Sequence, residues 1–169
     1  AVNPKSEISN LKSQIPDWPR NAIDYFILAR LNQKQIAPSP EADRETQIRR
    51  LSLDLTGLPP TAEEMSGFLS DRRPDAYERQ VDRLLASSHY GERMAVPWLD
   101  TVRFADTVGY HGDQNQRIFP YRDYVIRAFN QDKPYARFVQ EQVAGDALFP
   151  NDPDATVALG FLAAGPWDD

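Results

Sequence analysis

The sequence predicts an all-α fold, an irregular domain of about eight helices joined by proline-rich connections. Apolar residues recur at the three- and four-residue spacing of a helix through most of the chain, and no segment shows the alternation of a strand. All but one of the 14 prolines fall between helical segments or at their starts. Hydrophobic residues make up 41% of the 169 positions, which is enough to build a buried core.

The first three helices are defined by start and stop signals. Over residues 19–38 the apolar positions follow helical spacing and indicate the first helix. Asp43 can cap the second helix, and Gly57 marks its end. Thr61 and Glu64 form the pattern of a capping box, in which each side chain accepts the backbone N–H of the other residue. The third helix is thus expected to begin directly after Thr61.

Prolines mark the starts of three later helices. Pro74 suits the first turn of the fourth helix, Pro120 that of the sixth and Pro134 that of the seventh. Gly145 is the natural stop of the seventh helix, because glycine readily adopts the left-handed conformation that closes a helix.

The fifth and eighth helices are unusual. The fifth is expected over residues 91–105, with a kink at Pro97 because proline removes one helical hydrogen bond. The eighth, residues 154–164, is apolar on nearly every face, and such a helix must be buried on all sides. We therefore expect residues 20–169 to form a single helical domain that is a fragment of a longer protein truncated at its C-terminal end. Residues 1–19 are expected to form a strap or tail.

The net charge of −6 belongs to the C-terminal part of the chain. All 19 Lys and Arg residues precede Phe138, where they balance the acids of that segment. An acidic chain argues against nucleic acid or an anionic membrane surface as the main partner. We expect the acidic end to face a missing partner segment with basic residues. The acids beyond Phe138 are Glu141, Asp146, Asp152, Asp154, Asp168 and Asp169.

The chain has no cysteine, which excludes several chemistries. Disulfides, a thiol nucleophile, zinc–thiolate sites, iron–sulfur clusters and covalent attachment of haem c within this chain all require cysteine. The phosphate-loop, nucleophile-elbow and zincin motifs are also absent. No apolar run reaches the roughly 18 residues of a membrane span. We predict no cofactor in this chain, no metal site and no membrane span.

The longest irregular stretch, residues 106–119, carries most of the candidate catalytic residues. His111 lies between Asp106 and Asp113, and an imidazole beside carboxylates can act as a general base or a ligand. Asp100 precedes this stretch on the fifth helix and completes the candidate catalytic set. The alternative interpretation is a solvated loop that uses Asp and Gly for its turns.

Arginine outnumbers lysine by 15 to 4, which favours fixed carboxylate pairs over simple solubilisation. Asp100, Arg103 and Asp106 follow one another at i, i+3 spacing. Either these groups converge with Asp113 in a polar cleft, or the arginines clamp carboxylates and fix the register of helices.

Other polar residues form a predicted binding or structural cluster. Asp123 and Arg127 are spaced i, i+4 and are predicted to form an ion pair. Glu141 and Asp146 lie near the end of the seventh helix, where Asp146 can tie back the following loop. With Arg103, the members of this cluster are Tyr110, Tyr121, Arg122, Asp123, Asn130, Glu141 and Asp146.

Several short motifs of the sequence are shared with a known family. They are residues 23–31 (I-D-Y-F-I-L-A-R-L), 51–60 (L-S-L-D-L-T-G-L-P-P), 61–64 (T-A-E-E), 77, 81–87 (V-D-R-L-L-A-S), 89–93 (H-Y-G-E-R), 98–100 (W-L-D), 103–106 (R-F-A-D), 109–110 (G-Y), 121–123 (Y-R-D), 129–130 (F-N) and 141–146 (E-Q-V-A-G-D). Over about residues 20–169 the chain resembles the planctomycete-type, cytochrome-associated domain of unknown function, the second domain of the PSCyt family.

The resemblance implies a module of a large exported protein, periplasmic or secreted. In such proteins a cytochrome domain with haem c often precedes this domain, and a second uncharacterised domain follows it. Any haem would belong to that neighbour, because this chain lacks the cysteines that attach it. The family usually has an aromatic residue after Y-G-E-R and a histidine before W-L-D, where this chain has Met94 and Pro97. A metal or proton role for that histidine is therefore not carried over.

Three hypotheses of function follow. The first is an interaction or scaffolding module of an exported multidomain protein, with arginine–acid pairs holding its helices. The second is a hydrolase module that acts on extracellular polymer through Asp100, Asp106, His111 and Asp113. The third is a sugar- or metal-binding domain that uses the stretch over residues 106–119. The first is favoured, because no pair of residues has a spacing specific to catalysis.

Overall fold

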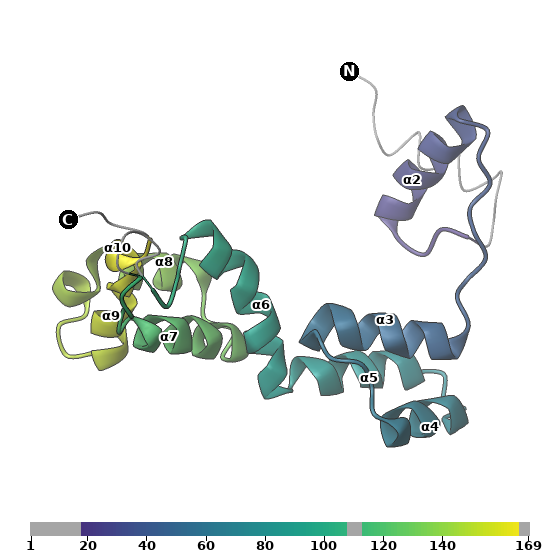
Figure 1. Cartoon of the computed structure of the whole chain (residues 1–169). Coiled ribbons are helices and arrows are strands. Elements are labelled where there is room, and N and C mark those ends of the chain that lie inside the picture. Colours follow the sequence, from purple (N-terminus) through teal and green to yellow (C-terminus); the bar gives the residue numbers. More distant parts are fainter. Residues whose placement is uncertain (1–17, 108–112, 166–169) are drawn as a thin grey trace. The chain divides into compact units, whose positions relative to one another are not determined.

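The computed structural model describes residues 18–107 and 113–165, and the regular elements in these two ranges are helices (Figure 1). The predicted all-α class is therefore confirmed. Besides the helices, the described residues contain an isolated antiparallel bridge between Thr107 and Asn115. The helices are α2 (Ala22–Gln33), α3 (Arg44–Thr56), α4 (Ala62–Ser70), α5 (Ala76–Leu85), α6 (Ser88–Thr101), α7 (Phe119–Asn130), α8 (Tyr135–Leu148), α9 (Pro153–Ala158) and α10 (Gly160–Ala163).

The chain divides into two compact units, Ala1–Ala42 and Asp43–Asp169. In the first unit, α2 begins with a capping box. The Asn21 side chain accepts hydrogen bonds from the backbone at the start of the helix, and the Asp24 carboxylate accepts the backbone N–H of Asn21.

The predicted domain boundaries stay a prediction. A tail was expected over residues 1–19, and residues 1–17 lie outside the described part of the chain. The single domain expected over residues 20–169 spans the boundary between the two units.

Three helices at the start of the second unit enclose a small apolar core. Ile48 on α3, Phe68 on α4 and Ala76 on α5 are buried, and Met65 packs against them. The predicted helix ends are confirmed here. Gly57 closes α3 in the left-handed conformation, with φ of 72°, and the capping box of Thr61 opens α4.

Arg44 joins two of these helices. From the first turn of α3, its guanidinium donates hydrogen bonds to the backbone carbonyls of Phe68 (2.5 Å) and Asp71 (3.0 Å) at the end of α4. The same group lies 4.0 Å from the centre of the Phe68 ring. A planar, permanently charged group can satisfy helix-end carbonyls and stack on a ring together, which is one use of the chain's many arginines.

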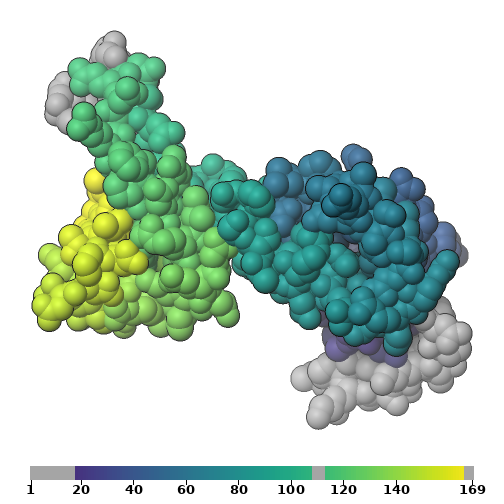
Figure 2. Space-filling view, turned by 90° about the horizontal axis from the view of Figure 1, so that it is seen from below, coloured from purple at the N-terminus to yellow at the C-terminus, as the bar shows by residue number. Residues whose placement is uncertain are grey.

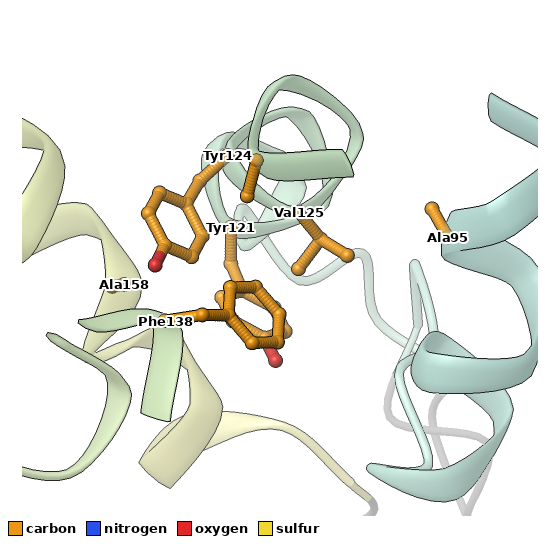
Figure 3. Close-up of a cluster of buried hydrophobic side chains, with 7 residues drawn as sticks. Ala95, Tyr121, Tyr124, Val125, Phe138 and Ala158 are labelled. Atoms are coloured by element: carbon orange, nitrogen blue, oxygen red, sulfur yellow. The ribbon is translucent and has the colours of Figure 1, made fainter. Parts of the chain in front are cut away.

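A second, larger core lies among the helices that follow. Tyr124 on α7 and Phe138 on α8, both labelled in Figure 3, stack with their ring centres 5.9 Å apart. Trp98 of α6 meets Phe138 edge-on at 4.9 Å. Because α6 packs against both α3 and α7, it connects the two cores of this unit. The buried members of the larger core are Ala95, Tyr121, Tyr124, Val125, Ala128, Phe138 and Ala158.

The predicted fifth and seventh helices differ from those observed. The fifth, expected over residues 91–105, is α6 and begins at Ser88, because the Ser87 side chain caps it three residues earlier. The seventh was expected to stop at Gly145. The regular helix breaks one residue earlier, at Ala144, whose φ and ψ are non-helical, and a second helical stretch continues α8 to Leu148.

Gly145 is required for a close contact, and it does not adopt the left-handed conformation expected of a helix-ending glycine. It is buried, and a Cβ atom built on it would lie 2.0 Å from the carbonyl oxygen of Ala155 on α9. Glycine at this position lets the backbones of α8 and α9 approach each other.

The prediction of one continuous helix over residues 154–164 was wrong, because the segment is divided into α9 and α10 at Leu159. Leu162 on α10 is 66% exposed, so the chain leaves part of this apolar segment uncovered, as the sequence predicted. Gly160, two residues earlier, packs on Tyr121.

Candidate functional site

Glu141 on α8 lies at the centre of a buried polar network. Its side chain is 1% exposed. One carboxylate oxygen, Oε2, accepts hydrogen bonds from the Tyr124 hydroxyl (2.6 Å) and from Nζ of Lys133 (2.5 Å). The other, Oε1, accepts one from Nε of Arg137 at 2.5 Å, and Arg137 reaches Asp152 at 2.8 Å. Two cations and two carboxylates therefore compensate one another.

The network shifts the pKa values of its members in opposite directions. Burial is the largest influence on Glu141 and would raise its pKa, but hydrogen bonds from Lys133, Tyr124 and Arg137 outweigh it and hold the pKa below its ordinary value of 4.5. Burial, followed by the hydrogen bond to the Glu141 carboxylate, raises the pKa of the Tyr124 hydroxyl. Glu141 is thus held as a carboxylate that accepts from Tyr124.

Lys133 reaches Glu141 because of the way α7 ends. The N–H groups of Asp132 and Lys133 bond back to the carbonyls of Phe129 (3.1 Å) and Ala128 (2.9 Å), and Asp132 is left-handed with φ of 47°. This is the Schellman pattern of helix termination. It turns the chain so that Nζ of Lys133 lies 4.8 Å from the centre of the Tyr124 ring.

A second group of hydrogen bonds joins α6, α7 and α8. The indole Nε1 of Trp98 donates to the Tyr121 hydroxyl and to Oε1 of Gln142, each at 3.0 Å. The Tyr121 hydroxyl donates to the same oxygen at 2.6 Å, and Gln142 donates to the carbonyl of Phe138. Burial raises the pKa of Tyr121 to about 12, partly opposed by the Trp98 hydrogen bond. These side chains are fixed in place by one another.

Asn130 fastens the start of α6 to the end of α7. Its Oδ1 accepts the backbone N–H of Gly91 at 2.7 Å, and its Nδ2 donates to the carbonyl of Ser88 at 3.0 Å. A Cβ at Gly91 would lie 2.4 Å from the carbonyl oxygen of Ile126, so only glycine permits this approach.

Replacing Asn130 with alanine is expected to lower the free energy of unfolding by about 1–2 kcal/mol, because it leaves a helix-terminal N–H of Gly91 without its partner. Asn130→Asp keeps the acceptor and loses only the donor to Ser88, so it should be less damaging. Urea denaturation measures both variants. A midpoint for Asn130→Ala equal to that of the wild type would contradict this role.

A pocket of about 320 Å³ opens beside these hydrogen-bonded residues. Phe138 and Trp98, both held in the interlocked groups described above, form part of its lining, while Tyr135 is 72% exposed. The pocket is lined by Tyr90, Trp98, Ala128, Phe129, Asp132, Lys133, Tyr135 and Phe138.

The contacts above join short motifs that lie far apart in the sequence. Residues 22–169 match the family PSCyt2, described as a protein of unknown function (DUF1549). The chain belongs to the PSCyt2 family. No curated protein and no solved structure matches it.

In this PSCyt2 domain, residues of different shared motifs contact one another. A Cβ on Gly57 of L-D-L-T-G-L-P-P would lie 3.3 Å from Cδ of Arg93 in Y-G-E-R. Trp98 of W-L-D bonds to Tyr121 of Y-R-D and to Gln142 of E-Q-V-A-G-D. Residues of these motifs therefore hold helices of the second unit together.

The candidate catalytic carboxylates of the PSCyt2 domain lie at the surface. Asp100, Asp106 and Asp113 are exposed, as is Arg103, and no ion pair among the described residues joins any of them. Figure 2 shows the green part of the chain, around residues 100–107 and 113–120, at the surface of the molecule. His111 and Tyr110 lie outside the described residues. A catalytic role for this set stays a prediction.

The other predicted cluster residues fall into different places. Tyr121, Asn130 and Glu141 belong to the hydrogen-bonded groups described above. Arg122 pairs with Asp123 at 2.9 Å on the outside of α7, and Asp146 accepts the N–H of Ala147.

The predicted ion pair between Asp123 and Arg127 was wrong. Arg127 bonds Asp154 on α9 at 2.9 Å, because α9 packs against α7 and brings a carboxylate within reach.

In residues 18–107 and 113–165, no group of three or more His, Cys, Asp or Glu side chains is arranged to hold an ion. None of the described helices combines the length and apolar character needed to cross a membrane.

Sequence reasoning missed most partners of Glu141. The i, i+4 spacing of Arg137 and Glu141 was an available signal for one of them. The contributions of Tyr124 and Lys133 had no local signal, since Tyr124 has the spacing of an ordinary core residue and Lys133 lies in a connection.

Proposed function

We propose that this PSCyt2 domain is an interaction module, with a partner polypeptide docking in the aromatic pocket of the second unit. The observation that supports this most is the pocket's aromatic lining, of which Trp98 is fixed by hydrogen bonds and Phe138 by stacking. Trp and Tyr are typical anchors of protein interfaces, because they bury a large area at a small cost in conformational entropy.

The pocket is preformed, which favours binding. Trp98 is held by two hydrogen bonds and Phe138 by stacking on Tyr124, so these lining residues need no rearrangement. A volume of about 320 Å³ suits one or two side chains of a partner segment.

The proposed partner is the domain that follows this one in the same exported protein, periplasmic or secreted, as the family resemblance implies. A cytochrome domain in that protein would hold its own haem c. This chain would then act as a scaffold between its neighbours.

Hydrogen exchange tests the proposal by comparing the 169-residue chain with the longer gene product that the resemblance implies. Residues 128–138, which border the pocket, should exchange more slowly in the longer product. Tyr135→Ala should remove that protection without unfolding the chain, because Tyr135 is largely exposed. Tyr77→Ala, an exposed tyrosine of α5 outside the pocket, is the matched control.

Equal exchange of residues 128–138 in the two proteins would contradict the proposal. A gene product no longer than 169 residues would contradict it as well, since the proposed partner would not exist.

A further inference from the structure

The aromatic pocket has the chemistry of a receptor for a cation, and we infer that it accepts an arginine side chain of the docked partner. This inference rests on the proposed docking role of the pocket and names its occupant. It follows from the charges in the pocket, from its rings and from the cost of alternative occupants.

Of the two charged residues that line the pocket, Asp132 alone has an uncompensated charge. Lys133 is 15% exposed, and its Nζ is bound to Glu141 at 2.5 Å. Asp132 is exposed, and its carboxylate forms no ion pair or hydrogen bond with the described residues. The Schellman turn at the end of α7 holds the Asp132 backbone in place. The pocket therefore presents one open negative charge beside its rings.

The rings of the pocket can attract a cation through their faces. Tyr90, Trp98, Phe129, Tyr135 and Phe138 surround its space, and a cation over such rings gains electrostatic energy that increases when water is excluded. The chain already packs its own cations in this way. Among the described residues, Lys133 lies over Tyr124 at 4.8 Å, Arg44 over Phe68 at 4.0 Å and Arg137 over Phe149 at 3.2 Å, each measured to the ring centre.

Other occupants fit less well. An anion would be repelled by Asp132, and an apolar side chain would strip water from that carboxylate without replacing it. An arginine can stack its planar group on a ring and direct its N–H groups at the carboxylate together. The chain beyond Phe138 has acids and no Lys or Arg, which favours the approach of a basic segment.

The test uses two peptides that differ only in charge at the inserted side chain. Ac-Gly-Arg-Gly-NH2 and its citrulline analogue are titrated at low salt into the ¹⁵N-labelled 169-residue chain, and NMR shifts of residues 128–138 and of the Trp98 indole are followed. The arginine peptide should bind about tenfold tighter, the factor expected when a ring contact and an ion pair act together. Equal affinity for the two peptides would overturn the inference.

Substitutions in the pocket separate the two contributions. Asp132→Asn should reduce the preference for arginine over citrulline from about tenfold to about threefold, because the rings still attract the cation, and asparagine tolerates the left-handed backbone at this position. Tyr135→Ala should weaken binding of the arginine peptide roughly threefold or more. Asp82→Asn, which removes an exposed charge of α5 outside the pocket, should change nothing. Unchanged arginine preference in Asp132→Asn would also overturn the inference.

The two proposals fail in different ways. Protection of residues 128–138 in the longer gene product, without arginine preference, would leave the docking role standing and show that its occupant is not a cation. Arginine preference without protection would support the cation pocket and contradict docking by the neighbouring domain.

Discussion

Replacing Glu141 with glutamine is expected to lower the free energy of unfolding by about 3 kcal/mol at pH 7. The substitution keeps the shape of the side chain but leaves Lys133 and Arg137 without the carboxylate that compensates them. Removing one partner of a buried ion pair costs roughly 3–5 kcal/mol. The lower end applies here, because Arg137 retains Asp152.

Denaturant unfolding measures this effect, and an exposed pair provides the control. Asp154→Asn removes the carboxylate that Arg127 bonds at 2.9 Å, but both side chains are nearly half exposed. Such a pair contributes less than about 1 kcal/mol. Equal losses in Glu141→Gln and Asp154→Asn would show that burial of the Glu141 network has no energetic importance.

The difference in the free energy of unfolding between the wild type and Glu141→Gln should depend on pH. The pKa of Glu141 is lower in the folded chain than its ordinary value of 4.5, so the folded state binds the proton less readily than the unfolded state does. The stability that Glu141 contributes is therefore complete above about pH 4.5 and is lost as the pH falls through the folded pKa. The difference between the free energies of unfolding of the two proteins should therefore decrease as the pH falls below about 4.5. A constant difference from pH 7 to pH 3 would argue against an ionised Glu141.

Gly145→Ala is the second substitution with a large expected effect, about 3 kcal/mol of destabilisation. The added Cβ would lie 2.0 Å from the carbonyl oxygen of Ala155, and that oxygen belongs to the backbone, so α9 must move away from α8. Overpacking of this kind costs roughly 1–3 kcal/mol or more. Thermal and denaturant unfolding measure the loss of stability, and hydrogen exchange in α9 reports the displacement of that helix.

Gly67→Ala is the matched control for this prediction. Gly67 lies inside α4, and nothing is within 4 Å of a Cβ built on it. Alanine should stabilise the helix there by roughly 0.5–1 kcal/mol, because it restricts the unfolded chain and favours helical dihedrals. If Gly145→Ala were as stable as Gly67→Ala, the close approach of α8 and α9 would not require glycine.

Local signals predicted the helix ends that depend on neighbouring residues. Gly57 closes α3 and Thr61 opens α4 as expected, because each of these interactions spans only a few positions of the chain. The buried face of α7 was also predictable from spacing, since Tyr121, Tyr124 and Val125 recur at helical intervals.

The same reasoning failed where a distant segment changes what a residue needs. Glycine is the residue type that often ends a helix, yet Gly145 is needed for the close contact with Ala155, ten positions away in the chain. Arg127 has Asp123 one turn before it, yet it bonds Asp154 because α9 packs beside α7. Neither of these distant partners can be recognised before the packing of the helices is known.

The sequence by itself determined the all-α class, the main helix signals and membership of the family, because these depend on composition, short-range spacing and shared words. Only the tertiary structure decided what Glu141 binds and that Trp98 and Phe138 border a pocket with Asp132. Such arrangements depend on contacts between helices far apart in the chain. Spacing along one helix selects which face is buried, but not which side chain of another helix it meets.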